Sequence, residues 1–242
     1  MANGAWLFLV LFSLSEIVSA QSKSLAEKQQ IVDAVGKNFN SGSVQTFDER
    51  YEGVKGSPLL SDEWADGEVH MKNGKVFDDL RIKYDLHRDE IVVKRQDGAE
   101  VIPDKNTVQS FHLDSTRTEP ARHFIRIEYL PNYRKFPYNR FAEVLYEGKS
   151  TLLLVRHRKF IKANYRGGYH ANRPYDSFGE VMLQYYWIDS QGRTRELKPN
   201  HKSVLRLFSD KRKLMRALIE DNTINLNRPL DIAKLVRYYD AH

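Results

Sequence analysis

Residues 68–85 read EVHMKNGKVFDDLRIKYD, and this stretch carries two signals of antiparallel β structure. Asn73-Gly74 lies between two strand-like segments, and this dipeptide is the strongest short-range signal of a tight hairpin turn. After the turn, Leu80, Ile82 and Tyr84 alternate with charged residues, which is the period of a half-buried strand. The stretch therefore predicts a hairpin that packs one face on a core.

The same pattern of short strands and tight turns recurs along the chain. Turn signals lie at 96–98, 147–148 and 189–192. The strand-like segments are 90–95, 99–102, 107–113, 123–130, 141–146, 150–159, 180–187 and 193–197. Roughly ten short strands in this arrangement predict a mainly β fold, an antiparallel meander that closes into a barrel-like or folded sheet.

Helical patterns flank the β region on both sides. Residues 22–40 have the apolar spacing of a short amphipathic N-terminal helix. Beyond the last strand, Asn200 is a candidate helix cap and Pro229 a helix-start signal. The expected organisation is a signal peptide at 1–20, an N-terminal arm with the short helix at 21–63, an antiparallel β domain at 64–198, and a helical tail at 199–242 that docks on the sheet.

The first twenty residues indicate export. An apolar run at 5–14 precedes Val18-Ser19-Ala20 and Gln21, which is the pattern of a secretory signal peptide cut after Ala20. The alternative is an uncleaved anchor, but the run is only about ten residues and a bilayer span takes about 20. No later stretch of the mature chain is long and apolar enough to cross a membrane. We therefore expect an exported bacterial protein that is periplasmic, outer-membrane-associated or extracellular.

Composition restricts the classes of function further. The 242 residues include no cysteine, so disulfides, thiol chemistry and a lipid-anchored cysteine are excluded. The formal net charge of +6 is modest and favours anionic surfaces, such as lipid headgroups or acidic glycans, through long-range attraction. Nucleic acid is not an expected partner, because an exported chain without a recognition motif gives it no support.

Basic and aromatic residues gather between positions 156 and 175. Arginine forks recognise phosphate and carboxylate through paired hydrogen bonds, and aromatic rings stack on cations and on sugar faces. The alternative is an outward strand face followed by a solvated loop, because neighbouring residues on a strand point to opposite faces. The predicted ligand-binding residues are Arg156, Arg158, Lys162, Tyr165, Arg166, Tyr169 and Arg173.

Two further groups are weaker candidates. Residues 129–141 combine aromatic and basic side chains, which we interpret as aromatics that cap a barrel end, with a binding edge as the alternative. Asp62, Glu63 and Asp66 lie beside Trp64, so they are either a turn or a carboxylate pair for glycan hydrolysis. The eight histidines have no metal-binding spacing, and nucleophile, phosphate-loop and dinucleotide motifs are absent. The sequence thus predicts no catalytic residue, metal or cofactor.

The tail segments LRLFSDK at 205–211, LIEDN at 218–222 and LVRYY at 235–239 carry a resemblance, together with GSPLL at 56–60 and Tyr185-Tyr186. The chain resembles an uncharacterised family of exported, β-rich Bacteroidota proteins with a helical C-terminal tail. The resemblance covers most of the mature chain and implies an envelope or secreted role, without any activity or site residues. We expect a non-enzymatic accessory or binding module whose partner is an envelope protein or an anionic surface. The alternatives are an anionic glycan- or lipid-binding protein and an envelope glycan hydrolase.

Overall fold

The computed structural model describes residues 51–94, 98, 100–130, 134, 136, 139–164, 174–221 and 224–242. The expected signal peptide and N-terminal helix lie outside these residues. The strands are β1 (Ala65–Met71), β2 (Val76–Asp85), β3 (Glu90–Lys94), β4 (Glu100–Val101), β5 (Val108–Leu113), β6 (Arg122–Arg126), β7 (Phe141–Glu147), β8 (Thr151–Ile161), β9 (Ser177–Ile188) and β10 (Thr194–Leu197). The helices are α2 (His201–Leu207), α3 (Arg212–Glu220) and α4 (Pro229–Ala241), with short 3-10 turns η2 (Ile127–Tyr129) and η5 (Ser209–Lys211).

The strands form one antiparallel sheet in the order β10-β9-β8-β7-β6-β5-β1-β2-β3-β4. The order is a meander with one break: after β4 the chain passes β3 and β2, and β5 pairs with β1 on the side opposite β2. The expectation of a mainly β, antiparallel fold is therefore confirmed.

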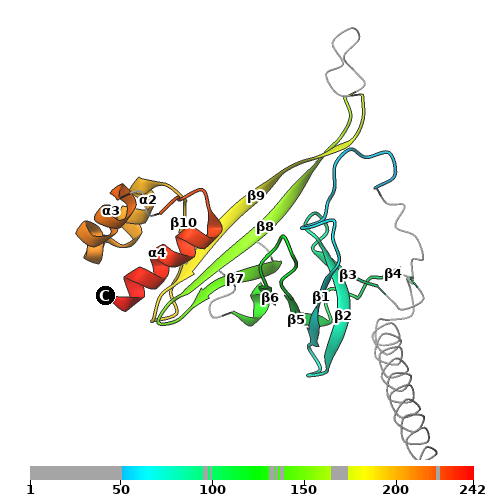
Figure 1. Ribbon diagram of the computed structural model, residues 1–242, viewed down its shortest axis with the longest axis horizontal. Coiled ribbons are helices and arrows are strands. Elements are labelled where there is room, and N and C mark those ends of the chain that lie inside the picture. The colour runs from blue at the N-terminus through cyan, green and yellow to red at the C-terminus, as the bar shows by residue number, and fades with distance from the viewer. Residues whose placement is uncertain are drawn as a thin grey trace, which may run out of the picture.

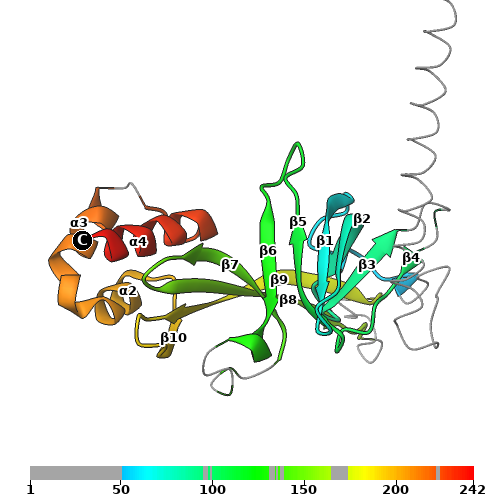
Figure 2. The same cartoon turned by 90° about the horizontal axis from the view of Figure 1, so that it is seen from below.

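Closure into a barrel was expected and is not found. The sheet is open, and its two edges are β10, with four residues, and β4, with two. The physical reason lies at the β10 end, where the apolar face of the sheet is covered by the helical tail instead of by the opposite edge. Figures 1 and 2 show α2, α3 and α4 together at one end of the elongated sheet and β1 to β4 at the other.

The hairpin predicted at Asn73-Gly74 joins β1 to β2. Gly74 has a φ of 81°, a left-handed conformation that glycine adopts without steric cost. The backbone N–H of Met71 donates to the carbonyl of Lys75 at 2.8 Å, and the N–H of Lys75 donates to Oδ1 of Asn73 at 3.0 Å. The local turn chemistry therefore sets the register of the first two strands.

The half of the sheet made by β1 to β6 has its own aromatic core. The rings of Phe111 and Phe124 stack with centroids 4.6 Å apart, and Tyr84 meets each of them edge-on or tilted at 5.2 Å. Phe141, the first residue of β7, packs on Phe111 at 4.9 Å. These side chains are fully buried, so the predicted alternation of β2 does place Tyr84 inward.

The other half of the sheet is covered on both faces. Trp187 and Tyr185 of β9 pack with the helices, whereas Tyr186 and Ile188 face a cluster that includes Ile127 and Phe136. Residues 185–188 are consequently all buried, although the alternating sequence of β9 suggested one buried face. The helical tail and the segment after β6 are the two layers that enclose this end of the sheet.

The helical tail begins as predicted at Asn200. Its side-chain Oδ1 accepts a hydrogen bond from the N–H of Ser203 at 2.9 Å, which satisfies one of the free donors at the start of α2. Ser209 and Asp210 do not cap α3, because they form the 3-10 turn η5 that links the two helices. No helix within the described part of the chain has the length and apolar character needed to cross a membrane.

Candidate functional site

A cavity of about 370 Å³ lies where the β2–β3 turn, residues 139–140 and one face of β8 and β9 meet. This volume lies within the range of small-molecule sites. We call it the basic cavity, and its lining is Arg88, Asp89, Lys105, Asn139, Arg140, His157, Met182 and Gln184. These residues come from segments far apart in the sequence, so only the folded chain assembles the site.

The β2–β3 turn is built by two aspartates. Oδ1 of Asp85 accepts hydrogen bonds from the backbone N–H groups of His87 at 2.8 Å and Arg88 at 2.9 Å. Asp89 closes the turn in the left-handed region with a φ of 61°, a conformation that aspartate tolerates better than most residues. The turn therefore holds Arg88 and Asp89 at the rim of the basic cavity.

Asp89 is the centre of a buried polar network. It accepts hydrogen bonds from the Tyr84 hydroxyl at 2.6 Å, from Nη1 of Arg126 at 3.0 Å and from the backbone N–H of Phe141 at 3.1 Å. Asp89 is 4% exposed and Arg126 is 3% exposed. Burial raises the pKa of the Asp89 carboxyl, while the guanidinium groups of Arg140 and Arg126 act in the opposite direction.

This network leaves the basic cavity with an excess of positive charge. The single carboxylate in its lining, Asp89, forms ion pairs with Arg126, which lies behind it, and with Arg140, whose Nε is 3.9 Å from Oδ1 of Asp89. The lining holds three cationic side chains against this one carboxylate: Arg88, Lys105 and Arg140. Since a low-dielectric wall strengthens the field of such charges, the cavity attracts anions.

Two of the lining residues carry buried nitrogens without hydrogen-bond partners in the part of the chain that the structure describes. These nitrogens are Nε of Arg140, which lies 3.9 Å from Oδ1 of Asp89 in an ion pair, and Nδ1 of His157, which donates or accepts according to the tautomer. Nη2 of Arg140 is held by the carbonyl of Leu86 at 2.6 Å, so the guanidinium is fixed in place. Buried polar groups in native proteins are nearly always hydrogen-bonded, so these atoms suit a polar ligand.

His157 makes the stability of the fold depend on pH. Burial, together with the neighbouring Arg140 charge, lowers the pKa of His157 below its ordinary value. The unfolded chain takes up this proton at a pKa of about 6.5, whereas the folded chain resists it, so the free energy of unfolding falls as the pH drops from about 7 toward 5. We expect His157→Gln to flatten this fall in urea unfolding curves measured across that range. His201→Gln, at an exposed position, is the control, and equal slopes for wild type and His157→Gln would contradict the assignment.

The structure separates the residues predicted from the 156–173 stretch. Arg156 points away from the basic cavity, and its Nε binds Oε2 of Glu143 at 2.8 Å, with Nη1 of Arg122 on the other carboxylate oxygen at 3.2 Å. Its neighbour His157 lies on the opposite face and lines the cavity, as strand alternation requires. Arg158 lies in β8 with a buried Nε that lacks a hydrogen-bond partner among the described residues, and Lys162 is exposed. Tyr165, Arg166, Tyr169 and Arg173 lie outside the described residues.

The 129–141 group contributes two residues to the basic cavity, Asn139 and Arg140. Of its described aromatic residues, Phe136 and Phe141 are buried and Tyr129 is exposed, and none caps a barrel end, because the sheet is open. Phe136 packs on Tyr186 at 4.7 Å, and Phe141 lies under the Arg126 guanidinium at 3.8 Å. Sequence reasoning missed Arg88, Asp89, Lys105 and His157 as members of one site, and the only local signal was the charged turn between β2 and β3.

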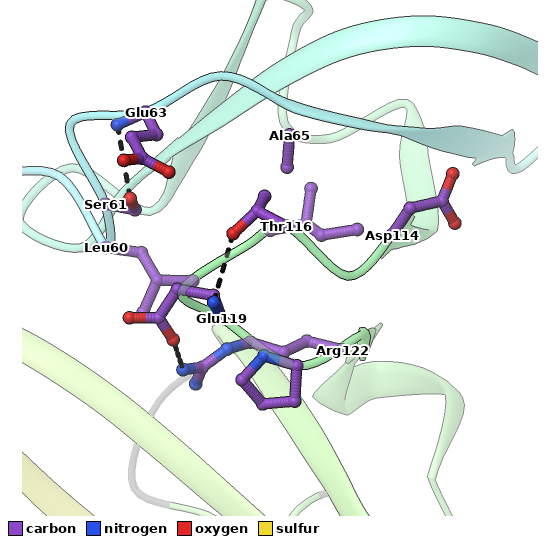
Figure 3. Close-up of a pocket in the computed structure, with 10 residues that line it drawn as sticks. Leu60, Ser61, Glu63, Ala65, Asp114, Thr116, Glu119 and Arg122 are labelled. Atoms are coloured by element: carbon purple, nitrogen blue, oxygen red, sulfur yellow. Dashed lines mark hydrogen bonds and ion pairs between the residues drawn. The ribbon is translucent and has the colours of Figure 1, made fainter.

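A much smaller pocket lies beside the acidic residues Asp62, Glu63 and Asp66 at the start of β1 (Figure 3). Of the three predicted acids only Glu63 lines it, while Asp62 accepts a hydrogen bond from Oγ of Ser57 at 2.6 Å. Figure 3 shows Glu119, another lining residue, turned toward Arg122, with which it forms an ion pair. The pocket volume of about 20 Å³ holds roughly one water molecule, which is too little for a sugar ring.

Comparison with known proteins gives no further assignment, because no family model, curated protein or solved structure matches this chain.

Proposed function

We propose that the protein is an exported, non-enzymatic binding module of the cell envelope and that the basic cavity is its ligand site. One observation carries the proposal. The cavity combines three cationic side chains with two buried nitrogens, on Arg140 and His157, that lack hydrogen-bond partners among the described residues, and the one carboxylate in its lining is already paired with Arg126 and Arg140. Such a lining favours a ligand with a compact negative charge, a phosphate or a carboxylate.

The uncharged residues in the lining favour a sugar that bears the negatively charged group. The side-chain amides of Asn139 and Gln184 offer both donors and acceptors, as do sugar hydroxyls. Met182 is the only apolar side chain among the eight lining residues, so an acyl chain has one apolar side chain to pack against. We therefore propose an anionic glycan unit as the ligand in preference to a lipid.

Calorimetric titration of the protein tests this proposal with glucuronate, glucose 6-phosphate and neutral glucose as probes. We expect the two anionic sugars to bind and glucose not to bind, with affinity that falls as salt rises because charge attraction is screened. Lys105→Gln and Arg140→Gln should each weaken binding by about tenfold, as expected for loss of a charge-assisted hydrogen bond of about 1.4 kcal/mol.

Arg195→Gln is the matched control, because Arg195 is an exposed arginine on β10, away from the cavity. Lys105 is also exposed, so its substitution leaves the packing intact even if Arg140→Gln perturbs the fold. Equal binding of glucose and the anionic sugars, or unchanged affinity in Lys105→Gln and Arg140→Gln, would reject the basic cavity as the site.

A further inference from the structure

The fold gathers three histidines that the sequence keeps apart. Glu68, His112 and His123 are cross-strand partners in one row across β1, β5 and β6. His70 lies two residues further along β1, on the same face as Glu68. Side chains at directly opposed positions have Cβ atoms about 5 Å apart, so this row places imidazole and carboxylate groups within reach of one another.

These groups already interact. Nε2 of His70 lies 2.9 Å from Oε1 of Glu68, and this hydrogen bond, with smaller contributions from the charges of His112 and His123, lowers the pKa of Glu68. Nε2 of His112 lies 3.6 Å from Oδ1 of Asp114. The side chains of Glu68, His70 and His112 are 43%, 41% and 36% exposed, so solvent and ions reach them.

The ring separation is close to what a bound metal ion requires. The centroids of His112 and His123 are 6.3 Å apart. With Zn–N bonds of about 2.0–2.1 Å and tetrahedral angles, two imidazoles on one zinc ion have centroids roughly 5 Å apart. Across the described residues no group of three or more such side chains is placed to hold a metal ion in this conformation, so binding requires these side chains to move. Exposed side chains change rotamer within nanoseconds, so a shift of roughly 1 Å is easily made on binding.

We propose that His112, His123 and Glu68 form a binding site for a divalent transition-metal ion, with Zn²⁺ as its best match. Two imidazoles and a carboxylate are a ligand set that zinc accepts, whereas Mg²⁺ prefers oxygen ligands alone. His70, which lies 2.9 Å from Glu68, is a further donor for the fourth position. Asp114, with Oδ1 3.6 Å from Nε2 of His112, adds a negative charge beside the site. This site is on another part of the sheet and does not depend on the basic cavity.

Titration of metal-free protein with Zn²⁺ tests the proposal. We expect one saturable site at about pH 7.5 and binding at least tenfold weaker at about pH 5.5, because the imidazoles must lose their protons to bind metal. His112→Gln and His123→Gln should each weaken binding by about tenfold or more, with thermal unfolding as the check that the variants fold. Mg²⁺ should not compete.

His201→Gln controls for nonspecific binding of Zn²⁺ to an exposed histidine, since His201 is exposed at the start of α2. The absence of saturable binding up to about 1 mM Zn²⁺ would overturn the proposal. A dissociation constant of about 1 mM corresponds to a binding free energy of only about 4 kcal/mol. Zinc binding by the His112→Gln/His123→Gln double variant as tight as that of wild type would overturn it as well.

Discussion

Replacing Asp89 by alanine is expected to lower the free energy of unfolding by about 3–5 kcal/mol, which is the cost of leaving one member of a buried ion pair without its partner. Arg126 is 3% exposed and donates to Asp89 at 3.0 Å. Alanine would also remove the acceptor for the Tyr84 hydroxyl and for the Phe141 N–H. Urea unfolding followed by circular dichroism measures the change.

A double-mutant cycle separates charge from packing at this site. Asp89→Asn keeps an acceptor oxygen and tolerates the left-handed backbone, but it removes the charge. If the ion pair is the cause, Asp89→Asn combined with Arg126→Met should cost less than the sum of the two single changes. Asp78→Asn, at an exposed position on β2, should change stability by less than about 0.5 kcal/mol. A cost for Asp89→Ala as small as that of the control would show that Arg126 finds another partner or reaches water.

Trp187→Ala is expected to have an effect of similar size, about 3–5 kcal/mol. The Trp187 ring is 4% exposed and lies between the sheet and the helical tail. It meets Phe208 edge-on at 5.1 Å and Tyr239 edge-on at 5.7 Å. Removing it leaves a cavity against both ends of the tail, so α4 should lose protection in hydrogen exchange before the β1–β6 half does.

Met182→Ala is the matched control, because Met182 lies on the same strand and is 50% exposed. Its loss should cost less than about 0.5 kcal/mol, as for other surface substitutions. If Trp187→Ala costs less than about 1 kcal/mol, the helical tail does not rest on this face of β9.

Local chemistry explains why so many elements were predictable. The Asn73-Gly74 turn, the alternation of β2 and the Asn200 cap each depend on residues within a few positions of one another. A turn that needs a positive φ can be recognised by its glycine, and a cap can be recognised by its amide or hydroxyl. These signals act before any long-range contact forms, so the order of strands and helices follows from them.

The arrangement of the sheet was less predictable, because it depends on contacts between distant segments. No local signal indicates that the chain passes β3 and β2 after β4 so that β5 pairs with β1. The alternation of β9 suggested one buried face, but the helical tail and the segment containing Phe136 bury both faces. Closure was inferred from the number of strands, whereas openness results from where the helical tail docks.

The candidate site shows the same limit. The sequence predicted a contiguous basic-aromatic site. Because side chains alternate along β8, Arg156 instead pairs with Glu143 on one face and His157 lines the basic cavity on the other. A charged side chain that is already paired is not available to a ligand. Arg156 is paired with Glu143, which lies 13 residues earlier in the sequence on the neighbouring strand. Likewise the row of Glu68, His112 and His123 exists only because β1, β5 and β6 are neighbours in this register.

The two short edge strands have a consequence for how the protein behaves in a crowded compartment. A sheet of this width would normally be a template for other chains, because an unpaired edge presents a row of backbone donors and acceptors. Here one edge is two residues long and the other is four. Each offers few pairing positions to a foreign strand, although β10 covers only residues 185–188 of the twelve-residue β9. Short outer strands therefore limit pairing at their own edges without closure into a barrel, whereas the rest of β9 does not have this protection.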